Sequence, residues 1–172
     1  MKLIALHVYK WKNENACLLS HEIDVSMLWF YQRNMAKEHI TFNSRTIAGR
    51  IPPGNKASIG LENNIGMCFC WTTKDDITVT AMTDNDYPEN AAFILINNII
   101  MQFRDAFGKN GTLDNITRDT DLKWGELEVF LKNWQNPHEA DKLMKIEKEL
   151  FEVKEIVHKN LVDLLKRGEE MD

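Results

Sequence analysis

The C-terminal part of the chain repeats a seam of residues at alternating spacings of three and four, the pattern of a helix that packs along one stripe. The nine seam positions are Leu143, Ile146, Leu150, Val153, Val157, Asn160, Leu164, Arg167 and Met171. Seven of the nine are apolar, and most of the residues between them are charged. An isolated helix of this length is not dependable in water, so the pattern predicts a helix over 137–172 that partner helices stabilise.

Arg167 is the unusual member of this seam, because its side chain carries a permanent charge at a position that otherwise holds Leu and Val. Burying an unpaired guanidinium costs several kcal/mol, so we expect polar groups of the partners to face Arg167. The alternative is a generic terminal coiled-coil helix whose Arg167 extends its charged head into solvent.

The preceding residues alternate between strand-like and helix-like patterns. Runs of β-branched and aromatic residues between polar turns predict five strands, over 3–11, 17–25, 56–61, 65–72 and 77–82. Apolar spacings of three and four predict three helices, over 36–50, 88–107 and 124–134. Both alternating sets of the first strand are apolar, so helices should cover both faces of the sheet. We expect an α+β domain over 1–136, with a boundary at the helix-start signal of Asn136 and Pro137.

Composition excludes several kinds of partner. A formal net charge of −5 and a pI near 5.6 argue against binding to nucleic acid or to anionic lipid through a polybasic patch. The most apolar stretch, 91–103, is interrupted by two asparagines and is too short for a membrane span. The first residues do not form a signal peptide, and three cysteines do not suggest a disulfide framework. We therefore expect a cytosolic protein.

Catalytic and metal-binding motifs are not apparent in the sequence. It contains no G-x-S-x-G, no phosphate-binding loop with Gly-Lys-Ser/Thr, and no H-E-x-x-H. Cys68 and Cys70 could lie on one face of a strand and hold a metal, but the five histidines are scattered, and buried structural thiols are favoured. We expect neither a cofactor nor an enzymatic activity.

The residues around Arg167 carry a resemblance to a known family. The string over 164–171, Leu-Leu-Lys-Arg-Gly-Glu-Glu-Met, is similar to the centre of the fusion motif in lipid-anchored longin-domain R-SNAREs, the prenylated synaptobrevin-like family. The order strand, strand, helix, three strands, two helices resembles the longin domain, which is profilin-like. The turn over 84–88, Asp-Asn-Asp-Tyr-Pro, looks like the family's strand-to-helix turn, although Asn90 stands where many longins carry an arginine.

This resemblance implies a fusion protein. In the family a central arginine meets one glutamine from each of three Q-SNARE helices, and an asparagine is familiar two layers earlier; Arg167 and Asn160 stand at those places. The implied function is docking and fusion of vesicles in traffic among the ER, Golgi, endosomes and vacuole, on the cytosolic face of the membrane. The family's motif continues several heptads past the arginine and ends in cysteines that take prenyl and palmitoyl chains, so we interpret residues 137–172 as its N-terminal half.

The family also folds its motif back over the longin domain, and lipid can occupy the same apolar groove. The resemblance makes Phe42 the candidate groove residue of this autoinhibited closed state, although an ordinary core aromatic is an equal alternative. Apolar residues off the seam could pack on the domain in that state. They are Met144, Phe151, Ile156, Leu161 and Leu165.

Two other functions remain open from the sequence. One is a longin-type trafficking adaptor or tether subunit, in which the last helix packs permanently on the domain and binding to Q-SNARE helices does not occur. The other is a small-molecule sensor, because domains of this topology often hold ligands in apolar grooves.

Overall fold

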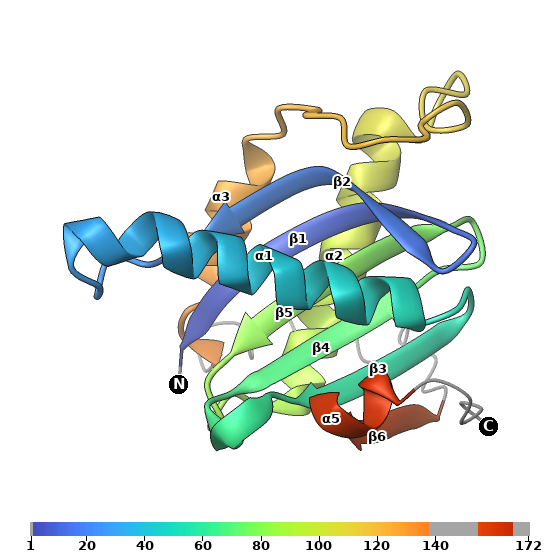
Figure 1. The fold of residues 1–172 in the computed structure, drawn as a ribbon. Coiled ribbons are helices and arrows are strands. Elements are labelled where there is room, and N and C mark those ends of the chain that lie inside the picture. The colour runs from blue at the N-terminus through green and yellow to red at the C-terminus, as the bar shows by residue number, and fades with distance from the viewer. Residues whose placement is uncertain (1, 138–154, 167–172) are drawn as a thin grey trace.

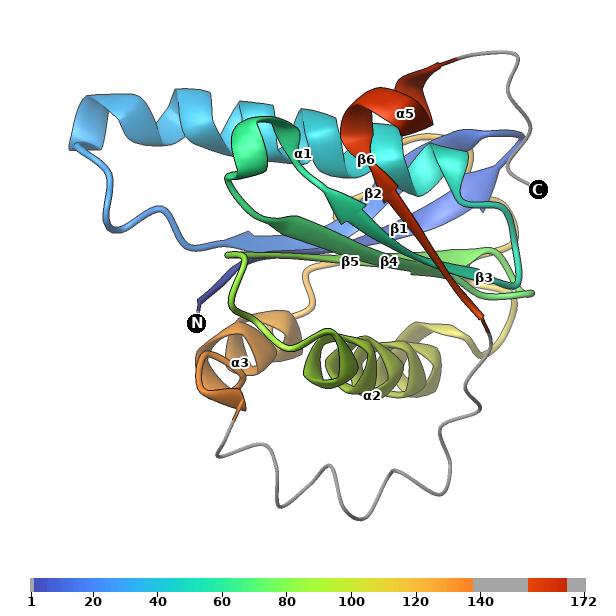
Figure 2. The same cartoon turned by 90° about the horizontal axis from the view of Figure 1, so that it is seen from below.

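A single mixed sheet divides the protein into two helical layers (Figures 1 and 2). The computed structural model describes residues 2–137 and 155–166. The strand order is β2 (Asn15–Ile23), β1 (Leu3–Lys12), β5 (Ile77–Thr83), β4 (Met67–Thr72), β3 (Asn55–Gly60) and β6 (Ile156–Asn160). One face is covered by the helices α1 (Arg33–Arg50) and α5 (Leu161–Leu165), and the other by α2 (Glu89–Phe107) and α3 (Glu126–Asn133), as Figure 2 shows. The expected α+β class, with helices on both faces of the sheet, is confirmed.

All five predicted strands are present. They are β1 (Leu3–Lys12), β2 (Asn15–Ile23), β3 (Asn55–Gly60), β4 (Met67–Thr72) and β5 (Ile77–Thr83). Each pairs with its neighbours among these five in antiparallel fashion. The β1–β2 hairpin turns on Asn13 and Glu14, which both have positive φ, as a two-residue hairpin turn requires.

The three predicted helices are also present, with boundaries that differ by a few residues. They are α1 (Arg33–Arg50), α2 (Glu89–Phe107) and α3 (Glu126–Asn133). Two short 3-10 helices, η1 (Phe30–Gln32) and η2 (Glu62–Asn64), lie in the connections. Pro88 is the N-cap of α2 rather than its first helical residue.

The two main apolar cores lie on opposite faces of the sheet. The larger joins α2 and α3 to the sheet through residues such as Phe69, Phe93 and Phe103. The smaller lies between α1 and the sheet and includes Ile47 and Ile59. Both faces of the sheet are therefore buried, as the apolar alternation of the first strand predicts.

The C-terminal segment differs from expectation. Residues Ile156–Asn160 form a sixth strand, β6, which runs parallel to β3, and Leu161–Leu165 form the short helix α5. A continuous helix over the described part of 137–172 is therefore wrong for this structure. The outer edge of β3 explains the difference, because an unpaired strand edge is a strong template for any extended segment. The parts of the predicted helix over 138–154 and 167–172 lie outside the described residues.

A loop pinned to α1 covers part of the opposite edge of the sheet. The Nη1 and Nη2 atoms of Arg45 donate to the two carboxylate oxygens of Asp119, at 2.9 and 2.8 Å. Asp119 also accepts from the backbone nitrogen of Leu18 on β2 at 2.9 Å. Next to it, Thr120 and Leu122 donate backbone hydrogen bonds to the carbonyls of Leu18 and Leu19. The hydrogen bond from Arg45 holds the pKa of Asp119 below its usual value.

Gly49 lets the C-terminal half of α1 approach the β1–β2 hairpin. A Cβ atom at Gly49 would lie 2.5 Å from the carbonyl oxygen of Glu14. Gly49→Ala is therefore expected to lower the free energy of unfolding by about 1–3 kcal/mol, as overpacking does. Urea denaturation would measure it, with Gly125→Ala as the matched control, because a Cβ there meets nothing within 4 Å. Equal stability of the two variants would contradict this account of the contact.

Candidate protein-interaction site

The C-terminal segment of the protein docks on its own domain, against the sheet and α1. We call residues 155–166 the arm, and the outer edge of β3 with the adjoining face of α1 the arm site. Along this edge Ala57 pairs with Val157, and Ser58 pairs with His158. A five-residue parallel ladder thus joins residues that lie a hundred positions apart in sequence.

Apolar contacts hold α5 against the C-terminal half of α1. Leu161 and Leu164 are each only 4% exposed and pack with Ile47, Ile51 and Ile59. Full burial of such a side chain contributes about 1.5–3 kcal/mol relative to exposure. The two leucines are therefore the main apolar anchors of the described arm.

Polar contacts secure the two ends of α5. At its start the side chain of Asn160 accepts a hydrogen bond from the backbone nitrogen of Asp163 at 2.8 Å, which is a helix N-cap. At its end Arg50 of α1 donates to the carbonyl oxygen of Leu164 at 3.1 Å. Arg50 therefore satisfies one of the carbonyl groups that a short helix leaves without an internal partner.

On the other face of the sheet, the arm reaches α2 through a polar cluster. The Nε2 atom of His158 lies 2.7 Å from Oε1 of Glu89, and the hydroxyl of Ser58 donates to the same carboxylate oxygen. His158 and Glu89 are both substantially exposed, with side chains 63% and 38% accessible. Solvent therefore weakens this pair, and it contributes more to the register of β6 on β3 than to stability.

The structure places three of the nine seam residues. Leu164 is buried in the arm site, Val157 is half-buried on β6, and Asn160 is the exposed cap of α5. Among the off-seam residues, Leu161 is buried, Ile156 is half-buried against the larger core and Leu165 is 39% exposed. The other residues of these two sets lie outside the described part of the chain. They are Leu143, Met144, Ile146, Leu150, Phe151, Val153, Arg167 and Met171.

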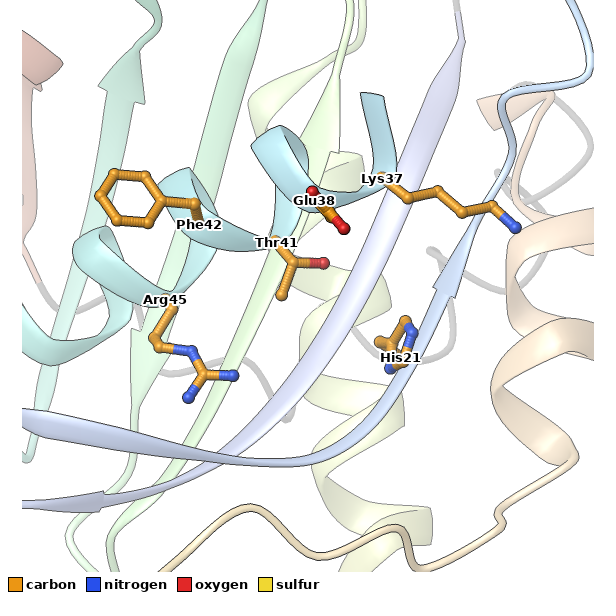
Figure 3. A pocket seen from close by; sticks show the side chains of 6 residues that line it. All are labelled: His21, Lys37, Glu38, Thr41, Phe42 and Arg45. Atoms are coloured by element: carbon orange, nitrogen blue, oxygen red, sulfur yellow. The ribbon is translucent and has the colours of Figure 1, made fainter. Parts of the chain in front are cut away.

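Phe42 lies apart from α5, on the exposed side of α1. Its side chain is 68% exposed, so the alternative of an ordinary core aromatic is wrong. Figure 3 shows it beside an open pocket of about 390 Å³ that Thr41 and four charged or titratable side chains also line. These four are His21, Lys37, Glu38 and Arg45. The pocket is thus surrounded by charged or titratable residues, although the surface that they present to it is largely apolar.

Buried groups beneath the pocket are neutral and hydrogen-bonded to α1. His7 of β1 is fully buried, and its Nε2 atom lies 3.0 Å from the hydroxyl of Thr41. Burial, with smaller contributions from His21 and Arg45, lowers the pKa of His7 to about 3. Tyr9 donates to Ser44 at 2.8 Å, and Ser44 lies 2.6 Å from the hydroxyl of Thr80. These contacts fix α1 on the sheet and therefore fix the shape of the arm site.

Several features of this site are not apparent from sequence reasoning. The β-branched pair Ile156 and Val157 was the available signal for β6, and the Asn160–Asp163 spacing was the signal for a new helix start. No local signal connects His158 to Glu89, because the two are distant in sequence.

In the described ranges, 2–137 and 155–166, no helix is long and apolar enough to span a membrane. The same residues contain no group of three or more His, Cys, Asp or Glu side chains placed to hold a metal ion. Cys68 and Cys70 are buried, and burial raises the pKa of both thiols.

The comparisons with known proteins agree with this fold. The longin family model, described as "Regulated-SNARE-like domain", matches residues 28–123. The VAMP-like protein YKT61 of Arabidopsis thaliana is 34% identical over 174 residues, covering 100% of this chain and 85% of its own length. The synaptobrevin homologs YKT6 of Saccharomyces cerevisiae and ykt6 of Schizosaccharomyces pombe are 31% and 28% identical, with the same coverage.

A helix-covered mixed sheet with these matches defines a longin-domain protein. The chain belongs to the longin-domain R-SNARE family, of the type represented by these synaptobrevin homologs. Its role is accordingly that of an R-SNARE in vesicle trafficking, and it is not an enzyme.

Removing the two leucine anchors should release the arm. In Leu161→Ala/Leu164→Ala we expect backbone amides of β3 and β6 to exchange at least about tenfold faster, because each truncation costs roughly 2–5 kcal/mol at a buried site. Hydrogen exchange followed by mass spectrometry would measure this in the full chain. Val162→Ala/Leu165→Ala is the matched control, because those side chains are 53% and 39% exposed. Similar exchange in both variants would exclude the leucines as anchors.

Proposed function

We propose that this protein is an R-SNARE whose arm blocks assembly while it is docked, and that assembly with three Q-SNARE helices requires the arm to leave its site. The proposal is supported by the position of two residues that are predicted to face partner helices but pack on the longin domain in this structure. Leu164 and Val157 are predicted seam positions of a four-helix bundle, yet both pack on the domain here.

The two states differ in backbone conformation as well as in contacts. A bundle requires a continuous helix through residues 156–165, whereas the docked arm contains a strand followed by a separate helix. Because the same backbone cannot do both, the free energy that holds the arm on β3 and α1 has to be overcome before the seam can zipper. The docked arm therefore acts as an autoinhibitory element.

In the assembled state we place Arg167 at the centre of the bundle, facing one glutamine from each partner. The remaining seam residues, from Leu143 to Met171, supply the apolar layers on either side. The proposal also includes a C-terminal lipid anchor on the cytosolic face of Golgi, ER and vesicle membranes, as in the family. Met144 and Phe151, which precede the arm, are proposed to pack on the domain as well.

Phe42 is proposed to take part in the closed state at a second contact, away from α5. Its exposure on α1 supports a surface role, because an exposed phenylalanine costs solubility without contributing to the core. The proposal also places lipid beside Phe42, with an acyl chain in contact with Phe42 and a headgroup near the charged groups around the pocket.

Assembly with Q-SNARE helices is the direct test of function. The chain, extended to the natural end of its motif, should form a heat-resistant four-helix complex with three cognate Q-SNARE helices. Arg167→Asp should weaken this complex, because a carboxylate cannot donate hydrogen bonds to the facing glutamines. A chain that binds no combination of Q-SNARE helices would instead be a longin-type adaptor or tether subunit.

Autoinhibition has its own test, which uses a residue off the seam. Leu161→Ala should speed assembly by about tenfold or more, because it removes an anchor of the docked arm but no predicted layer of the bundle. The rate would be followed by fluorescence of a labelled Q-SNARE helix. Val162→Ala is the control, since its side chain is 53% exposed and lies off the seam. An unchanged rate for Leu161→Ala would exclude the arm as a brake, although assembly itself could still occur.

A further inference from the structure

A cluster of exposed apolar side chains lies at the end of the molecule where β2 leads into α1. We call it the apolar tip. Its members are Met27, Trp29, Phe30, Tyr31 and Met35, with exposed fractions of 53%, 72%, 85%, 78% and 75%. Figures 1 and 2 show this connection projecting beyond the ends of the neighbouring strands. Large apolar side chains exposed this far, and this close together, indicate an interaction surface.

Hydrogen bonds hold the backbone of the tip in place. The guanidinium of Arg33 donates to the carbonyl oxygens of Leu28 and Ser26, at 3.1 and 3.2 Å. Asp24 accepts from the backbone nitrogen and the hydroxyl of Ser26, at 3.0 and 2.6 Å. Between them the buried side chain of Val25 anchors the connection to the domain. The aromatic side chains are therefore presented outward by an ordered turn.

The charge of the tip differs from that of the whole protein. Between residues 25 and 37 there is no Asp or Glu, and the charged residues are Arg33 and Lys37. The chain as a whole carries a formal charge of −5. Arg33 and Lys37 are near the aromatic side chains in sequence and are complementary to a negatively charged surface that is apolar underneath, although Asp24 and Glu38 flank this stretch and make it neutral overall.

The shape of the tip selects among apolar partners. Side chains that are more than half exposed at a projecting end form a convex surface, whereas peptide helices usually dock into grooves. Trp and Tyr are suited to the interface of a bilayer, because one end of each ring is apolar and the other can hydrogen-bond to water or headgroups.

We propose that the apolar tip docks the longin domain directly on an anionic membrane, with Trp29, Phe30 and Tyr31 in the headgroup region. The occupant is a lipid surface, and the docking is peripheral. It goes beyond the proposed SNARE function, since it requires neither bundle formation nor a lipid anchor. The arm packs on the opposite half of α1, near Ile47 and Arg50, so the described part of the docked arm leaves the tip uncovered (Figure 2).

Flotation with vesicles tests the proposal on the full chain. We expect the chain to float with vesicles of equimolar phosphatidylcholine and phosphatidylserine, and less with phosphatidylcholine alone. Trp29→Ser/Phe30→Ser/Tyr31→Ser should reduce the bound fraction by about tenfold or more. The matched control is Ile65→Ser/Met101→Ser/Val129→Ser, which removes three apolar side chains, 65%, 48% and 47% exposed, from other surfaces. Circular dichroism should show that both variants remain folded, as expected for exposed positions.

A second measurement follows Trp29 itself. Vesicles should shift the tryptophan emission of the wild-type chain to shorter wavelength, and Trp29→Phe should abolish that shift while keeping vesicle binding, because phenylalanine is still apolar. The proposal is overturned if the wild-type chain does not bind anionic vesicles, or if the tip variant binds as well as the control. It is also overturned if the chain dimerises without lipid and the tip variant is monomeric, since the tip would then bind a second copy.

Discussion

The pairing of β3 with β6 is the interaction on which the rest of this structure depends. Without β6, the outer edge of β3 would present a row of unpaired backbone groups beside the apolar side chains Ala57 and Ile59. The arm covers the backbone edge and the apolar surface together. Strand β6 pairs with the backbone of β3, and Leu161 and Leu164 pack on the adjoining apolar side chains. The close approach at Gly49 and the contacts of His7 and Tyr9 hold α1 on the sheet, and α1 supplies the side chains on which Leu161 and Leu164 pack.

The proposed function requires the arm sequence to serve two structures. Ile156 and Val157 are β-branched and suit a strand, yet Val157 and Leu164 also keep the spacing of a helical seam. Asn160 marks the change, since it ends the strand and caps the short helix in this structure, although it is a predicted layer of the bundle. The exposed polar pair between His158 and Glu89 helps to set the register of β6 but adds little stability to the docked arm.

Local patterns predicted most of the domain but not the arm. The strands and the main helices follow from alternation and from spacings of three and four, because these periods reflect burial on one face or both. The start of α1 was placed three residues late, because Arg33 joins the helix through contacts to Ser26 and Leu28 that periodicity does not contain. Local patterns miss β6, because its β-branched pair Ile156 and Val157 is a weak signal and a strand edge a hundred residues away decides the pairing. The sequence also does not predict that Phe42 and the apolar tip are exposed, because aromatic residues are usually buried.

The clamp between Arg45 and Asp119 has a consequence for the two edges of the sheet. By holding residues 119–122 along β2, it shields the centre of that edge by means that do not involve the arm. In the proposed released state the β3 edge is exposed along its length, whereas residues 119–122 still cover β2 around Leu18 and Leu19. This partial cover disfavours pairing at the β2 edge. Edge-to-edge association of released proteins through β3 would therefore favour a pair over a fibre.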